Sequence, residues 1–79
     1  MENMYNKMIE RVLMYASAMN RYATSKDHMR NCTNAGALSE LIYMLNIMGH
    51  DVDDCTYQDG EYLKCAAIKV NNEYLIKYE

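Results

Sequence analysis

The chain has 79 residues, of which 51% are hydrophobic and 24% charged, with a formal net charge of −3 at pH 7. This length fits a single domain spanning residues 1–79. The composition is too apolar for a disordered tail and too charged for a membrane protein, and no apolar run approaches the roughly 20 residues that cross a bilayer. The first residues, MENMYNKMIER, carry charge in every turn, unlike a secretion signal, so we expect a cytoplasmic protein.

The charge is unevenly distributed along the chain. Residues 1–36 carry five basic and three acidic side chains, whereas residues 37–79 carry three lysines and eight acidic side chains. An acidic chain is a poor general binder of nucleic acid, because phosphate attracts basic patches. We keep as an alternative a small DNA-binding regulator that uses the basic residues of the first part. These are Lys7, Arg11, Arg21, Lys26 and Arg30.

Two helices are predicted in the first part of the chain. Over residues 2–24, apolar residues recur at intervals of three and four, which is typical of an amphipathic helix. A second helix is predicted over residues 27–48. Thr24 and Asp27 have the spacing of a capping box at its start, and Gly49 is suited to end it.

An antiparallel pairing of the two helices favours this early start of the second. With a turn near Ser25, Ala16 comes level with Ala35, and the close approach of small residues accounts for Gly36 inside a helix. The alternative is a start as late as Asn34, because the segment RNCTNAG has low helix propensity. The same register brings three further pairs together: Ile9 with Ile42, Val12 with Leu38, and Tyr5 with Leu45.

Beyond the second helix the apolar period changes to two, which predicts strands. Three strands are expected, over residues 52–57, 61–70 and 73–78. They are joined by tight turns at Asp59–Gly60 and Asn71–Asn72. The predicted fold class is α+β: an antiparallel helical hairpin packed on a three-stranded antiparallel meander, in the order α-α-β-β-β.

The alternation within the predicted sheet leaves two arrangements open. Without a bulge, Ile68, Val70 and Leu75 lie on the exposed face, and the sheet is apolar on both sides. These three residues would then form an oligomer interface, as in a homodimer. A bulge near Ala66–Ala67 would instead bring them round to the core.

Three cysteines, an odd number, indicate free thiols and not a disulfide framework. Together with His28 they are the ligand types of a zinc site, and Cys32 lies four residues from His28 on one helical face. No C-x2-C spacing supports such a site, and the predicted hairpin pairs Cys55 with Lys64, not with Cys65. We therefore expect no metal site and no cofactor.

The segment HDVDDCTYQDGEY, residues 50–62, holds five acidic residues but fits neither a calcium loop nor an active site. A calcium loop needs glycine at position six and glutamate at position twelve, and counting from Asp51 places threonine and tyrosine there. A catalytic set could be drawn from His50, Cys55 and Asp54, but the sequence offers no oxyanion site beside them. We expect that the protein is not an enzyme.

The same segment is the candidate partner-binding surface. Tyr57 and Tyr62 flank the predicted turn and are expected to be cross-strand neighbours. Tyrosine is enriched at binding hot spots, and tyrosines among acidic side chains would suit a basic groove on a larger protein. The alternative is a solvated hairpin without a partner. The candidate contact residues are Asp51, Asp53, Asp54, Tyr57, Asp59, Glu61 and Tyr62.

The chain resembles small accessory proteins of phages and mobile elements, which include anti-CRISPR and other anti-defence inhibitors. The resemblance rests on its size, its single compact α/β unit, its Met-, Tyr- and Asn-rich composition and its acidic hairpin. The resemblance matches no residue pattern, so it transfers no functional position. It implies a non-enzymatic protein that docks on a larger host protein and inhibits it. A hypothesis from another class is a homo-oligomeric module that sequesters a small ligand at a subunit interface.

Overall fold

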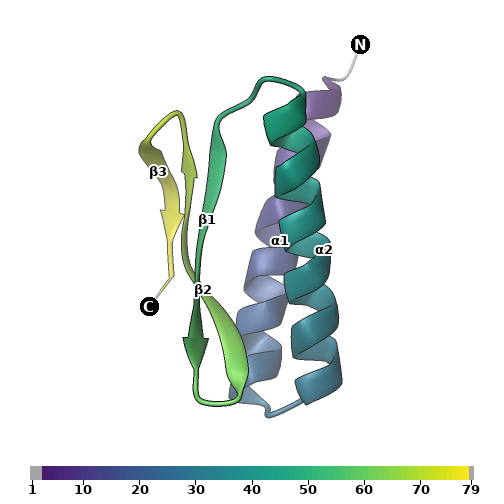
Figure 1. The fold of residues 1–79 in the computed structure, drawn as a ribbon, viewed down its shortest axis with the longest axis vertical. Helices are drawn as coiled ribbons and strands as arrows, with labels where there is room; N and C mark the ends of the chain where they lie inside the picture. Colours follow the sequence, from purple (N-terminus) through teal and green to yellow (C-terminus); the bar gives the residue numbers. More distant parts are fainter. Residues whose placement is uncertain (1–2, 79) are drawn as a thin grey trace.

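The computed structural model describes residues 3–78, which form two helices followed by three strands. The predicted α+β fold, in the order α-α-β-β-β, is confirmed. The helices form one layer and the antiparallel meander the other, so the sheet covers only one side of the helix pair (Figure 1). The elements are α1 (Met4–Thr24), α2 (His28–Ile47), β1 (Val52–Asp59), β2 (Tyr62–Val70) and β3 (Glu73–Lys77).

Both helices begin at a side chain that caps them. The Asn3 side chain accepts a hydrogen bond from the Tyr5 N–H (2.9 Å). Asp27 accepts one from the Arg30 N–H (3.2 Å) and pairs with the Arg30 guanidinium (2.8 Å). These two contacts, the backbone hydrogen bond first, hold the pKa of Asp27 below its ordinary value. The early start of the second helix is therefore confirmed, while the predicted start of the first, at residue 2, lies outside the described residues.

Two glycines of the second helical segment have different roles. α2 ends at Ile47, one residue before the predicted end, and Gly49 then takes a φ of +93°, as expected of a helix-terminating glycine. Gly36 is exposed, and a Cβ placed on it would meet no atom within 4 Å. The prediction that close helix packing requires glycine there is wrong, although Ala16 and Ala35 are both buried.

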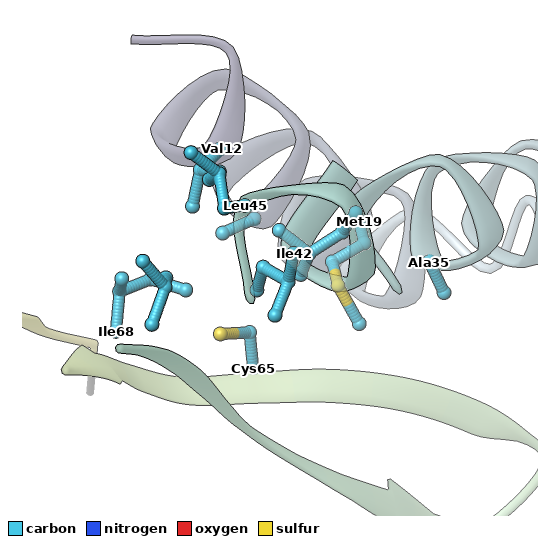
Figure 2. Packing of buried hydrophobic residues seen from close by; sticks show 10 residues of the cluster. Val12, Met19, Ala35, Ile42, Leu45, Cys65 and Ile68 are labelled. Atoms are coloured by element: carbon cyan, nitrogen blue, oxygen red, sulfur yellow. The ribbon is translucent and has the colours of Figure 1, made fainter. Parts of the chain in front are cut away.

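The core lies between the helix pair and the sheet (Figure 2). Each helix presents one apolar stripe to it because apolar residues recur with helical spacing: Val12 and Met19 of α1 and Leu38 and Leu45 of α2 are fully buried. The residues predicted to meet across the helices all belong to this core or pack against it. They are Tyr5, Ile9, Val12, Ala16, Ala35, Leu38, Ile42 and Leu45.

The β1–β2 hairpin turns at Gly60–Glu61, not at Asp59–Gly60 as predicted. Asp59 pairs with Tyr62, so β1 extends two residues beyond its predicted end. Gly60 supplies a positive φ (+63°), which the predicted turn also requires, and this residue alone therefore does not fix the register. The pairing is shifted by two residues, and each side chain stays on its predicted face because the alternation along a strand has a period of two.

β2 contains a bulge at the predicted position. Between the Asp54–Ile68 and Thr56–Cys65 pairs, β2 has one more residue than β1, at Ala66–Ala67. The extra residue turns Ile68 towards the helices, where it is completely buried in the core (Figure 2). The bulged arrangement of the two left open by the sequence is therefore the correct one.

The bulge removes most of the predicted oligomer interface. Ile68 is buried, Val70 is half-buried against the core, and only Leu75 remains exposed. The alternative of a sheet that is apolar on both faces is excluded, because β2 has one more residue than β1 at the bulge. The Asn71–Asn72 turn into β3 is as predicted, with a φ of +53° and +65° at its two residues.

Candidate functional site

The acidic segment lies mainly on the β1–β2 hairpin, whose tip reaches beyond β3 towards the α1–α2 connection (Figure 1). β3 pairs only with residues 67–70 of β2, so the half of the hairpin near its tip has no third strand. The two edges of this half differ. Helix side chains cover the edge of β2, whereas most of the edge of β1 is open.

Two asparagine amides take the place of a third strand along β2. The Asn31 amide donates to the Leu63 carbonyl (2.8 Å), and its oxygen accepts the Leu63 N–H (3.0 Å). Asn20 bonds Cys65 in the same way, at 2.9 and 2.8 Å. Asn31 also donates to the Met19 carbonyl (2.8 Å) and is completely buried. An amide offers both a donor and an acceptor, as a strand residue does, so both helices are tied to the strand edge.

These asparagines are not among the predicted site residues, although the spacing of both carries a signal. Asn31 lies on the buried stripe of α2, in line with four apolar residues at intervals of four and three: Ala35, Leu38, Ile42 and Leu45. A polar side chain on a buried stripe must find hydrogen-bond partners inside the protein. Asn20 likewise continues an apolar line of α1 at intervals of four and three, through Ile9, Leu13, Ala16 and Ala23.

A third asparagine closes only the start of the β1 edge. The Asn46 amide donates to the Val52 carbonyl (3.0 Å) and accepts the Val52 N–H (3.3 Å). Outward-pointing backbone groups recur at every second residue of an edge strand. Those of Asp54, Thr56 and Gln58 therefore point to the same edge, where no strand within residues 3–78 lies beside β1.

The predicted acidic contacts do not form one uniform negative face. Asp54 is half-buried and accepts a hydrogen bond from a threonine hydroxyl two residues later (2.7 Å). Lys64 pairs with Asp59 (3.2 Å), and Lys69 is the cross-strand neighbour of Asp53. The surface is thus acidic with a lysine beside two of its aspartates. Four of the predicted acidic contacts are exposed: Asp51, Asp53, Asp59 and Glu61.

The prediction that Tyr57 and Tyr62 are cross-strand neighbours is wrong, because the turn is shifted. Tyr57 pairs with Lys64 and is 49% exposed. Tyr62 is half-buried, with its ring edge-on to that of His28 at 5.4 Å between centroids. The His28 Nε2 is also 3.0 Å from the Glu61 carbonyl oxygen. Tyr62 therefore holds the hairpin tip against the start of α2, and Tyr57 is the tyrosine exposed to a partner.

The three cysteines are free thiols in different environments: Cys32 is exposed, Cys55 half-buried and Cys65 buried. Burial raises the pKa of the Cys65 thiol to about 11, and the thiol donates a hydrogen bond to the Ala67 carbonyl (3.3 Å). A thiol with this pKa is protonated at neutral pH and is a poor nucleophile. Within residues 3–78, no three His, Cys, Asp or Glu side chains gather as metal ligands would.

Two of the five basic residues considered for DNA binding come together at one end of the helix pair. The guanidinium groups of Arg21 and Arg30 lie 5.2 and 5.9 Å from the centre of the Tyr22 ring. Arg30 is also engaged by Asp27. Arg11 lies apart from them, in a hollow between the helices.

No helix within residues 3–78 is both long and apolar enough to span a membrane. Comparison of the chain with family models, with curated proteins and with solved structures gave no match in any of the three. Function must therefore be inferred from the geometry of the chain itself.

Proposed function

We propose that this chain is a small non-enzymatic binding module that docks on a larger protein through its β1–β2 hairpin. It acts as an inhibitor of the kind that phages and mobile elements direct against host defence proteins. One observation carries the proposal: the edge of β1 is open at Asp54, Thr56 and Gln58, while asparagine side chains close the edge of β2 and the start of β1.

An open edge of this length fits an extended segment of a partner that adds a strand to the sheet. Main-chain hydrogen bonds to the edge supply affinity in this mode, and side chains on the two faces supply specificity. The exposed Asp51, Asp53 and Glu61 favour a basic segment, because complementary charge speeds encounter and sets orientation. Tyr57 contributes apolar area beside the edge.

The competing explanation is that the acidic side chains only protect the edge. Charged residues on an exposed strand keep other chains from pairing with it, which prevents aggregation. Protection needs no partner, whereas docking requires that a change in the backbone edge weaken the binding of a specific protein. A backbone change therefore separates the two explanations.

The test uses Thr56→Pro, with Thr56→Ala as the matched control. Proline removes one N–H from the open edge and is tolerated on edge strands where that group faces solvent. The full chain is immobilised and exposed to extract of its host cells, and co-purifying proteins are quantified by mass spectrometry. We expect Thr56→Pro to reduce capture of the partner by roughly tenfold. The lost edge hydrogen bond is worth about 1 kcal/mol, and distortion of the strand by proline adds to this loss. Thr56→Ala should keep full capture, and circular dichroism should show both variants folded.

A second comparison tests the charge. The double variant Asp51→Lys/Glu61→Lys should weaken capture and reduce its dependence on salt, because exposed charges are screened by added ions. Binding that is indifferent to salt, to this charge reversal and to Thr56→Pro would refute docking through the hairpin.

A further inference from the structure

The second helix is apolar on the side that the sheet does not cover. Between residues 31 and 48 its one charged residue is Glu40. A surface helix of a small domain ordinarily pairs a buried apolar stripe with a polar outer face. Here the outer side carries four large apolar side chains that are each about half exposed or more: Tyr43, Met44, Ile47 and Met48.

The first helix continues this apolar surface, and the two helices together form a groove. Two adjoining hollows of about 500 and 290 Å³ lie along it and share Arg11 and Leu41. Figure 1 shows that the sheet lies on only one side of the helix pair, so no element formed by residues 3–78 covers the other side. The large apolar side chains that line the groove include Met4, Met8, Met14, Leu41 and Met44, and charged side chains lie among them.

We propose that this groove is the interface for a second copy of the chain. Two protomers related by a twofold axis pack their helix pairs against each other as a four-helix arrangement. In such an interface the same patch meets itself, so it must carry charges of both signs if charges lie within it. The groove meets this requirement, because its lining includes the basic Lys7 and Arg11 and the acidic Glu10 and Glu40.

Within residues 3–78, neither Arg11 nor Glu40 takes part in an ion pair with its own chain. Arg11 of one protomer can therefore pair with Glu40 of its partner, and the twofold axis repeats the contact. Methionine suits such a surface because its flexible thioether side chain adapts its packing to the partner.

The two hollows lie on the part of the helix pair away from the α1–α2 connection, from Met4 to Tyr15 of α1 and from Ala37 to Met44 of α2. Dimerisation through this face leaves the β1 edge free, so it is independent of the proposed hairpin docking.

The first experiment measures mass in solution from micromolar to millimolar concentration, with Met44→Lys as the test variant. The wild-type chain should shift to twice its 9.2 kDa as concentration rises. Met44→Lys should raise the dimer dissociation constant at least tenfold, since it buries a charge at the interface. Met29→Lys is the matched control: Met29 is 73% exposed at the opposite end of α2 and lies outside the groove, so this variant should dimerise normally.

The second experiment tests the predicted ion pair. Arg11→Glu and Glu40→Arg should each dissociate the homodimer, because each places two like charges opposite one another. An equimolar mixture of the two variants should form a heterodimer, in which both contacts again join opposite charges. Loss of folding cannot produce this recovery, so the mixture separates a lost interface from a damaged protomer.

Three outcomes would overturn the proposal. The wild-type chain could stay monomeric at millimolar concentration, or the dimer could persist in Met44→Lys. The monomer could instead bind neutral lipid vesicles, with binding lost in Met44→Lys, which would assign the groove to a membrane surface.

Discussion

The Asn31 amide bonds both backbone groups of Leu63, with its nitrogen 2.8 Å from the Leu63 carbonyl oxygen and its oxygen 3.0 Å from the Leu63 nitrogen. One side chain of α2 thus replaces a strand neighbour at a point where β3 does not reach. A third hydrogen bond, to the Met19 carbonyl, joins the same amide to α1. This single buried residue therefore connects both helices with the sheet.

Replacement of Asn31 by alanine should be strongly destabilising. It removes three hydrogen bonds and leaves the polar backbone groups of Leu63 and Met19 without these partners, so we expect a loss of about 2–4 kcal/mol in the free energy of unfolding. Asn34→Ala is the control, because the Asn34 amide donates only to the Arg30 carbonyl within α2. Urea unfolding followed by circular dichroism measures both variants, and equal losses would show that Asn31 does not link the layers.

The order of elements follows from the sequence because it depends on the period of apolar residues, which changes from helical spacing to alternation after Gly49. The asparagine links do not follow from it in the same way. The apolar stripe indicates that Asn31 needs hydrogen-bond partners inside the protein, but only the three-dimensional structure shows that Leu63 and Met19 supply them. The predicted acidic contacts likewise depend on pairing across strands, which composition does not determine.

Gly36→Ala should stabilise the protein. Gly36 lies inside α2 without a positive φ, and an added methyl group would meet no neighbour, so alanine gains about 0.5–1 kcal/mol through helix propensity. Gly49→Ala, with a φ of +93° at the end of the same helix, should be destabilising instead. Thermal unfolding should therefore shift in opposite directions for the two variants. A loss of stability in Gly36→Ala would restore the explanation by close helix packing.

The Asn71–Asn72 turn should accept glycine at its second position. Both residues have a positive φ, the pattern of a type I′ turn, for which Asn-Gly is the preferred pair. Asn72→Gly should therefore increase the free energy of unfolding by a few tenths of a kcal/mol, whereas Asn72→Val should decrease it by about 1 kcal/mol or more. Urea titrations that rank the two variants in the reverse order would show that this turn is not formed in solution.

The register of the β1–β2 hairpin shows that turn residues alone do not determine which strand residues pair. Asp59–Gly60 is a preferred turn pair, yet the turn forms at Gly60–Glu61, and Asp59 joins β1 opposite Tyr62. Glycine can adopt the positive φ of either turn, so packing beyond the turn decides. The observed register allows the contacts of Tyr62 with His28 and of Asp59 with Lys64, which link residues 34 and five positions apart. The first of these is a tertiary contact that no local pattern contains.

The buried thiol of Cys65 should make stability depend on pH in the alkaline range. Burial raises the pKa of this thiol from an ordinary value of 9.0 to about 11, so the folded chain holds its proton at a pH where the unfolded chain releases it. The contribution to stability is therefore fully present below about pH 9 and is lost progressively as pH rises towards 11. The measurement is urea unfolding of wild type and of Cys65→Ala, each at pH 8 and at pH 10.5. The comparison isolates the Cys65 thiol, because the other titrating residues are present in both proteins.

We expect the stability of wild type to fall more steeply with pH than that of Cys65→Ala. Parallel curves for the two proteins would show that the thiol is not protected by burial. Thiol labelling at pH 8 gives an independent measurement, because the exposed Cys32 should react rapidly while Cys65 reacts only as the chain unfolds. The two thiols thus report on the surface of α2 and on the core of the sheet in one experiment, and addition of urea should raise the labelling rate of Cys65 far more than that of Cys32.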